Sequence, residues 1–195
     1  MKLLYMRASR SRGYLVLGIA IEEEKLAFTV SEADYAELGS PRVGDRISED
    51  ALGFIKRSDE GYRARLCALR ILSYADNNEA TLCRKLIMKK ISPETARAVS
   101  REMTSLGYIN EDEQIKRAVV KEANINLLGP KKIRAKLCYK GFDSDAVDLA
   151  IESLVLSGEI DFTLSSKRLA AKKLARGASE QEIKMLLYKN GYDIC

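Results

Sequence analysis

The segment Leu82–Ile91 reads LCRKLIMKKI, and it recurs as IRAKLCYKGF from Ile133 and as IKMLLYKNGY from Ile183. The spacing of roughly 50 residues is the signature of a repeat architecture. In each copy two apolar residues stand four positions apart, as Ile133 and Leu137 do, which places them on one face of a helix. A unit that cannot bury its apolar face alone packs against its neighbours. The repeat therefore predicts a tandem array of similar helical units.

The second and third copies end in the same way, with a glycine followed by an aromatic residue, as Gly141–Phe142 and Gly191–Tyr192. Glycine readily adopts the left-handed conformation that ends many helices, and the next residue then folds back onto the last turn. The first copy has Lys90 in place of the glycine, which predicts a weaker stop at that position.

The similarity continues beyond the stop, because Ser92–Asp112 aligns without gaps with Asp143–Thr163. Ser92 precedes Pro93 and is a typical N-cap, and Asp143 occupies the equivalent place. A second helix is therefore expected after each of these stops. Capping pairs three residues apart predict the start of further helices: Asn110 with Glu113, and Ser179 with Glu182.

The N-terminal residues follow a different pattern. Tyr14–Ile21 and Leu26–Val30 are apolar and rich in strand-forming residues, and a charged segment separates them, which predicts a hairpin. Met1–Met6 is a candidate third strand. Ser31 is expected to cap a short helix, and Ser48 a second helix that runs toward Lys56.

We therefore predict a mainly α-helical fold. A small N-terminal β-hairpin plus helix module occupies residues 1–58, and three tandem three-helix repeats follow it in residues 59–110, 111–161 and 162–195. Stacking of the repeats predicts an elongated array.

Composition narrows the class of protein. The chain is 46% hydrophobic and 31% charged, and no apolar run approaches the length of about 18 residues that a membrane helix needs. No export signal is recognisable at the N-terminus. The cysteines are spaced too widely for a zinc site or a dense disulfide framework, which favours reduced thiols and a cytoplasmic protein: Cys67, Cys83, Cys138 and Cys195.

Basic residues are concentrated in the helical part of the chain. The segment from Lys116 to Lys140 contains a single acidic residue, Glu122, and the next predicted helix is acidic. Lys132, Lys136 and Lys140 are spaced four apart, so they form one stripe that is expected to be exposed beside the buried apolar face.

The start of this basic helix is a candidate anion site. Gly129 and Pro130 open the helix and leave free backbone N–H groups beside the lysines, an arrangement that suits a phosphate. A solvated helix face is the alternative interpretation of such a basic stretch. The candidate residues for binding a filament or a nucleic acid are Arg84, Lys85, Lys131, Lys132, Arg134, Lys136, Lys140, Lys167, Arg168, Lys172 and Lys173.

Catalysis finds little support in the sequence. The chain has no histidine, the commonest general base near neutral pH, and the run GPKKIR from Gly129 lacks the spacing of a phosphate-binding loop. Neighbouring acids such as Glu111 and Asp112 are explained by helix capping. We predict no enzyme, no cofactor and no metal site. Tyr108 and Tyr192 follow a stop glycine and are predicted to pack in the core.

The order and spacing of several motifs resemble the RecX family, bacterial regulators of the RecA recombinase. The segment FTVSE from Phe28 and the segment VGD from Val43 also resemble an N-terminal extension found in some members. The motifs in the helical part are ALRIL from Ala68, LCRKL from Leu82, GYINE from Gly107, LGPKKIRAKLCYKGF from Leu128, and the glycine-aromatic stop at Gly191.

This resemblance implies a non-enzymatic modulator that lies in the groove of the RecA filament on DNA and restrains ATP hydrolysis and strand exchange. Such a protein acts in homologous recombination, DNA repair and the SOS response. We expect a monomer without a membrane partner, and single- or double-stranded DNA is a further candidate partner. The alternative is a helical-repeat protein that binds DNA or RNA directly through the same basic residues, and a hydrolytic enzyme is the least favoured hypothesis.

Overall fold

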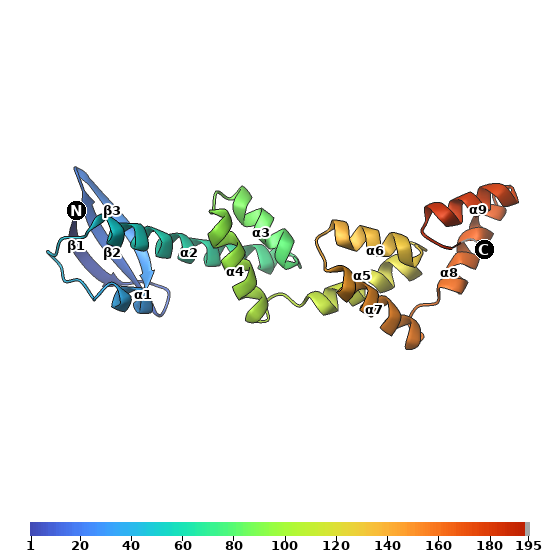
Figure 1. Cartoon of the computed structure of the whole chain (residues 1–195), viewed down its shortest axis with the longest axis horizontal. Helices are drawn as coiled ribbons and strands as arrows, with labels where there is room; N and C mark the ends of the chain where they lie inside the picture. Colours follow the sequence, from blue (N-terminus) through green and yellow to red (C-terminus); the bar gives the residue numbers. More distant parts are fainter. Residues whose placement is uncertain (194–195) are drawn as a thin grey trace. The chain divides into compact units, whose positions relative to one another are not determined.

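The computed structural model describes residues 1–193, so Cys195 and the end of the third predicted repeat lie outside the described residues. Helices predominate, and a three-stranded sheet precedes them (Figure 1). This confirms the predicted mainly α fold with an N-terminal β module. The chain forms two compact units, one of Met1–Ala75 with Cys83–Glu102 and the other of Asp76–Leu82 with the residues from Met103 onward. The predicted repeat boundaries stay predictions.

The N-terminal sheet is antiparallel, with the strand order β1-β2-β3. The predicted hairpin is formed by β2 (Tyr14–Ile21) and β3 (Glu24–Ser31), and the candidate third strand is β1 (Lys2–Ala8). Glu22 adopts a left-handed φ of 54° in the two-residue turn between β2 and β3, as tight hairpin turns require.

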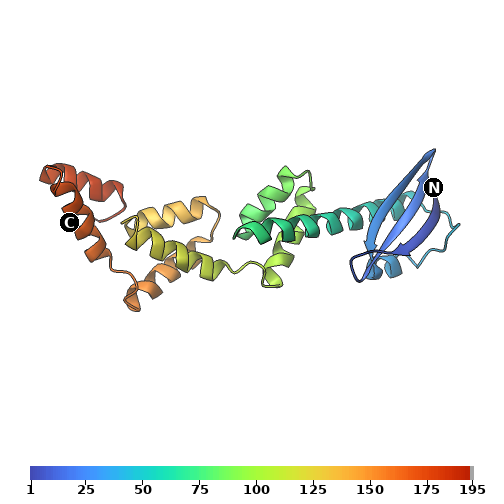
Figure 2. The same cartoon turned by 180° about the vertical axis from the view of Figure 1, so that it is seen from behind.

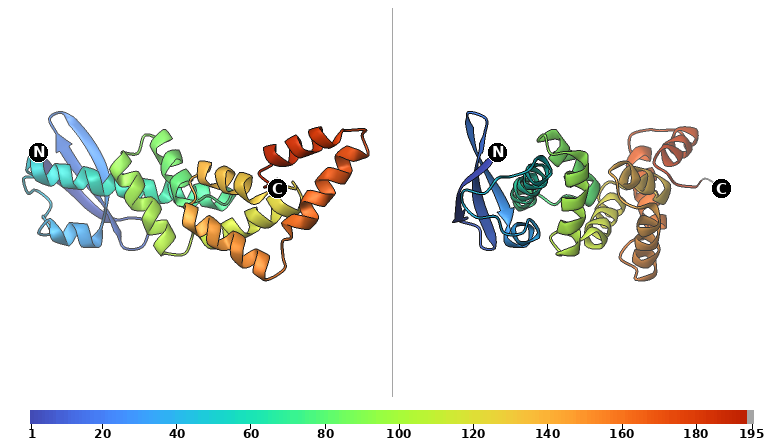
Figure 3. Two further views of the ribbon diagram at one scale, coloured as in Figure 1. Left: turned by 45° about the vertical axis from the view of Figure 1, so that its right-hand side comes forward. Right: turned by 60° about the vertical axis from the view of Figure 1, so that its left-hand side comes forward.

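Two helices cover one face of this sheet. Ser31 caps α1 (Glu32–Glu37), and Ser48 caps α2 (Glu49–Tyr74), both as predicted. Leu17 and Ile19 of β2 pack with Leu52 and Ile55 of α2 in a buried apolar cluster. The right-hand view of Figure 3 shows the strands edge-on with α1 and α2 on the same side of them.

The length of α2 differs from the prediction, which ended this helix near Lys56. The helix has 26 residues, and its buried residues change sides along its length. Ala64 follows Ile55 by nine residues, which is two and a half turns, so the two residues lie on opposite faces. Because the apolar periodicity is interrupted there, the pattern suggested a helix end where the helix in fact continues.

Seven further helices follow in residues 79–193, and four of them begin at the predicted caps Ser92, Asn110, Asp143 and Ser179. Asn110, Asp143 and Ser179 accept hydrogen bonds from the first turn of their helices, and Ser179 with Glu182 forms a complete capping box. The third predicted repeat contains two helices within the described residues rather than three, and these form a hairpin (Figure 2). The seven helices are α3 (Glu79–Met88), α4 (Pro93–Ser105), α5 (Glu111–Asn124), α6 (Pro130–Tyr139), α7 (Ser144–Leu156), α8 (Phe162–Leu174) and α9 (Glu180–Lys189).

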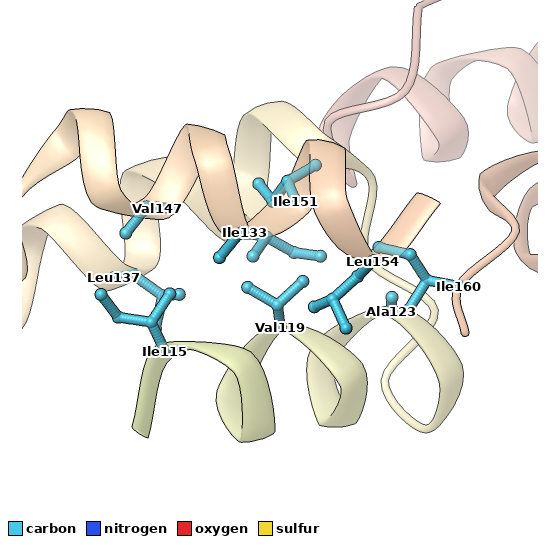
Figure 4. Close-up of a cluster of buried hydrophobic side chains, with 10 residues drawn as sticks. Ile115, Val119, Ala123, Ile133, Leu137, Val147, Ile151, Leu154 and Ile160 are labelled. Atoms are coloured by element: carbon cyan, nitrogen blue, oxygen red, sulfur yellow. The ribbon is translucent and has the colours of Figure 1, made fainter. Parts of the chain in front are cut away.

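The helices α5, α6 and α7 enclose one apolar core, shown in Figure 4. Ile133 and Leu137 of α6 are fully buried in it, which confirms the apolar face predicted from their spacing. They contact the face of α5 that carries Ile115 and Val119, and Leu154 of α7 closes the core from the other side (Figure 4). The opposite side of α6 is therefore the one that can carry charge.

Candidate polyanion interface

Each repeat helix ends in the same left-handed stop. Gly141 and Gly191 have φ values of +94° and +84°, and Lys90 adopts +64° without the freedom of glycine. The N–H of Phe142 donates to the carbonyl oxygen of Leu137 at 3.2 Å, and the N–H of Tyr192 donates to that of Leu187 at 3.1 Å. The stop at Lys90 makes the equivalent bond, from Ile91 to Leu86 at 3.2 Å, so its geometry is not weaker than that of the glycine stops.

The stop of α9 covers the start of α6. The N–H of Gly129 donates to the carbonyl oxygen of Asn190 at 2.7 Å, and Lys132 Nζ donates to the carbonyl oxygen of Lys189 at 2.8 Å. A Cβ added at Gly191 would lie only 2.4 Å from the backbone nitrogen of Lys132. The carbonyl oxygen of Asn190 therefore already accepts the N–H of Gly129, which argues against the phosphate site predicted at this helix start; that site stays a prediction.

The same junction, in which the stop of one helix contacts the start of another, occurs one repeat earlier. The Nδ2 of Asn78 donates to the carbonyl oxygen of Lys140 at 3.1 Å, while Asn78 Oδ1 accepts the N–H of Thr81 at 2.9 Å and so caps α3. A Cβ added at Gly141 would lie 2.7 Å from the Cβ of Ala80. The stop of α6 thus contacts the start of α3 as the stop of α9 contacts the start of α6.

Lys136 belongs to the packing of its own repeat. Its Nζ lies 2.6 Å from Oε1 of Glu122, whose side chain is buried, and Asn126 Nδ2 donates to the other carboxylate oxygen at 2.8 Å. Burial raises the pKa of Glu122, but the hydrogen bonds from Lys136 and Asn126 outweigh it and hold the pKa below the ordinary value. The side chain of Lys136 is 41% exposed, so the predicted exposed lysine stripe is only partly exposed at this position.

The charge separation between α6 and α7 is also used within the fold. Arg134 Nε donates to both carboxylate oxygens of Asp148, at 2.9 Å and 2.8 Å, and Lys131 forms an ion pair with Asp193. The acidic helix therefore neutralises part of the basic helix. Four of the candidate cations, at positions 131, 132, 134 and 136, have partners inside the protein.

A basic face without such partners lies on α8. Lys167, Arg168 and Lys172 are all exposed, and they lie within about half of the circumference of the helix, whereas Ser165 is buried. The sequence of α8 contains no acidic residue, and within residues 1–193 no carboxylate forms an ion pair with these three cations. We call these three residues the α8 basic face.

The other candidates are placed differently. Lys173 is half-buried, and its charge contributes to lowering the pKa of Glu182, although the hydrogen bonds from Ser179 contribute more. Arg84 is exposed and Lys85 is half-buried on α3. Lys140 is exposed at the stop of α6. The cluster predicted at positions 167–173 is thus reduced to the three cations of the α8 basic face.

The tyrosines near helix ends differ in burial. Tyr192 is buried, as predicted, and its hydroxyl donates to the carbonyl oxygen of Leu127 at 3.0 Å, while burial raises its pKa to about 12. Tyr108 is 57% exposed, so the prediction that it packs in the core is wrong. The backbone of Tyr108 donates to Met103 in the usual helix stop, but the ring faces solvent.

Two further observations concern the class of protein. Within residues 1–193, no helix is long and apolar enough to cross a membrane. Cys67, Cys83 and Cys138 are half-buried free thiols.

Comparison with known proteins places these features in a family context. No family model matches the chain. A curated relative from Lactobacillus delbrueckii subsp. bulgaricus, named Regulatory protein RecX, is 24% identical over 176 residues, which cover 87% of this chain and 64% of the relative. A Xanthomonas campestris protein of the same name is 29% identical over 131 residues, covering 65% of this chain and 78% of the relative. The chain thus spans less than two thirds of the length of the first relative.

Solved structures agree with the sequence matches. A crystal structure of regulatory protein RecX superposes with a TM-score of 0.74 at 21% identity, covering 98% of this chain and 94% of that chain. The chain is RecX-like in sequence and in fold. The predicted resemblance to RecX is thereby confirmed. RecX from Lactobacillus salivarius matches 69% of this chain and 90% of its own length with a TM-score of 0.58 at 23% identity.

Proposed function

We propose that the chain is a regulatory protein that binds RecA recombinase filaments on DNA and restrains their ATP hydrolysis and strand exchange. The observation that carries this proposal is the similarity to proteins named Regulatory protein RecX over 87% of the chain. Such a regulator acts by binding rather than by catalysis, and the sequence without histidine fits that role. Its setting is recombination, DNA repair and the SOS response in the cytoplasm, and we propose that it acts as a monomer.

The α8 basic face is our leading candidate for the contact with the filament. A filament on DNA presents phosphate groups, and cations that are free of internal partners can approach them without breaking contacts that the fold needs. Lys132 and Lys136 fit this role less well, because the first bonds to Lys189 and the second to Glu122. Arg84, Lys85 and Lys140 remain secondary candidates.

Charge reversal tests this assignment. The Lys167→Glu, Arg168→Glu double variant is compared with Lys56→Glu, Arg57→Glu, a matched pair of adjacent exposed cations on α2. Co-sedimentation with RecA filaments on single-stranded DNA measures binding, and filament ATP hydrolysis measures modulation. The α8 variant should bind more weakly, and the slope of log affinity against log salt should fall by about 0.7 to 0.9 for each lost phosphate contact. Modulation that matches the α2 control would reject the α8 basic face.

The second candidate function is direct binding of DNA or RNA through the same residues. The three exposed cations of α8 favour it, because phosphate contacts alone give affinity without a protein partner. Affinity for bare DNA and RNA, measured beside affinity for the RecA-coated filament, separates the two functions. A preference for the coated filament supports regulation of RecA, and equal or tighter binding to bare nucleic acid supports the alternative.

A further inference from the structure

The N-terminal sheet has a second face that neither of its helices covers. Leu17 and Ile19 point toward α1 and α2, so Val16, Gly18 and Ala20 on β2 point away from them. Their cross-strand partners are Arg7 and Tyr5 on β1 and Thr29, Ala27 and Lys25 on β3. We call this surface the outer sheet face.

Tyr5 lies flat at the centre of the outer sheet face. A Cβ added at Gly18 would fall 2.1 Å from the Tyr5 ring, so the ring rests directly on the backbone of β2. The strand backbone supports one side of the ring, and Tyr5 nevertheless remains 40% exposed. The guanidinium carbon of Arg7 lies over the ring at 5.9 Å from its centre, as a cation–π contact, so a planar group on this ring would stack beside the guanidinium. An exposed aromatic ring on a floor of small residues is a surface on which a planar group can stack.

Cations surround this ring. Lys2 pairs with Ala20 on one side and with Arg46 on the other, and Lys25 pairs with Ala20 from β3, so Arg46, Lys2 and Lys25 stand in one cross-strand row. Arg7 stands on the other side of Tyr5 along the same strand. All four cations are exposed. The outward strand positions of the described sheet carry no carboxylate, although the module as a whole contains many acidic residues.

We propose that the outer sheet face binds single-stranded DNA, with one base stacked on Tyr5 and the adjoining phosphates bound by Lys2, Arg7 and Lys25. Charge complementarity with the phosphates and the supported ring together argue for this partner. A base must be unpaired to stack in this way, so duplex DNA does not fit. Gly18, Ala27 and Ala20 carry no polar side chain, and the cations around the ring are assigned to the phosphates, so none of these groups is left to recognise a ribose 2′-hydroxyl, which favours DNA over RNA.

This inference does not rest on the proposed regulation of RecA. The full-length chain carrying Lys167→Glu and Arg168→Glu serves as the background for the test, so that the α8 basic face does not contribute to binding. Fluorescence anisotropy with labelled oligothymidylate, its duplex with oligoadenylate, and oligouridylate gives the three affinities. The single-stranded DNA should bind at least about tenfold more tightly than the duplex, since only an unpaired base can stack. Equal binding of the duplex, or tighter binding of the RNA, would overturn the proposal.

Variants locate the contact. Tyr5→Leu should weaken binding of oligothymidylate by about 5-fold to 100-fold, which is the range for loss of one stacked base, and Tyr5→Phe should retain it. Lys25→Gln should lower the salt slope by about 0.7, whereas the matched control Arg57→Gln on α2 should leave it unchanged. An unchanged slope in Lys25→Gln would count against the proposal.

Photocrosslinking provides a measurement that does not depend on the stability of a variant. Oligodeoxynucleotides that contain 5-bromouracil crosslink to aromatic side chains in direct contact with the base. The crosslink should map to the tryptic peptide Leu3–Arg7, whose only aromatic residue is Tyr5. A crosslink confined to peptides outside the module would refute the assignment of this face.

Discussion

The contact between the stop of α9 and the start of α6 leads to a quantitative prediction for Gly191→Ala. The new Cβ would lie 2.4 Å from the backbone nitrogen of Lys132 and 2.7 Å from its Cβ. Backbone atoms in the first turn of a helix cannot move aside without breaking that turn, so the stop of α9 has to separate from α6. Gly177→Ala is the matched control, because Gly177 has a similar φ of +79° and nothing within 4 Å of an added Cβ.

The two substitutions share one cost and differ in another. Placing alanine in the left-handed conformation costs about 1–2 kcal/mol at either position. Separation of α9 from α6 also breaks three hydrogen bonds, from Gly129 to Asn190, from Lys132 to Lys189 and from Tyr192 to Leu127. Each contributes about 0.5–1.5 kcal/mol, so Gly191→Ala should be more destabilising than Gly177→Ala by about 2–4 kcal/mol.

Urea unfolding followed by circular dichroism gives the free energy of each variant, and amide hydrogen exchange shows where the loss occurs. In Gly191→Ala, amides of α9 and of the first turn of α6 should exchange faster, while those of the N-terminal sheet should not change. Equal destabilisation by the two substitutions would refute the inferred junction, since backbone strain alone would then explain both.

Three further predictions concern buried polar groups. Lys136→Glu should destabilise the chain by about 2–4 kcal/mol because it sets a like charge against the buried Glu122. The control Lys116→Glu, on the exposed side of α5, should change stability by no more than about 0.5 kcal/mol. Equal urea midpoints for the two variants would contradict this prediction. Because folding lowers the pKa of Glu122, the contribution of this carboxylate to stability is complete above pH 4.5 and is lost as the pH falls through the folded pKa. Between neutral and acid pH, the free energy of unfolding should therefore fall less steeply in Glu122→Gln than in the parent. Equal slopes in the two proteins would argue against this role. Burial raises the pKa of Tyr192 from 10.0 to about 12, so the stability linked to this group is present below pH 10 and is lost between pH 10 and 12. An ultraviolet difference titration of the parent against Tyr192→Phe should place the ionisation of Tyr192 near pH 12. Ionisation near pH 10 would show that the ring is not buried.

Local signals in the sequence were enough to predict most of the helical part. Asp143, Ser179 and Gly191 act through neighbours within a few residues, and their roles as caps and stops are confirmed. The partners of the lysines lie much further along the chain. Lys131 pairs with Asp193, and Lys132 bonds to the backbone of Lys189, so no local pattern could have shown that these cations are engaged.

The outer sheet face was missed for a different reason. Side chains alternate between the two faces of a regular strand, so Lys2 and Tyr5, three positions apart, would be assigned to opposite faces. A bulge between Leu3 and Tyr5 shifts the register of β1, which brings Lys2 and Tyr5 to the same face. One extra residue in a strand is rarely evident from the sequence alone.

The recurring junction also explains which helix stops tolerate a side chain. Gly141 and Gly191 each touch the start of another helix, and an added methyl group would collide with it. Lys90 adopts the same left-handed conformation with an exposed side chain, which shows that backbone conformation alone does not demand glycine here. The start of α9 satisfies its own N–H groups through the box of Ser179 and Glu182 and needs no incoming helix. At Gly141 and Gly191 glycine therefore meets a steric demand of the contact with another helix, and at Lys90 that demand is absent.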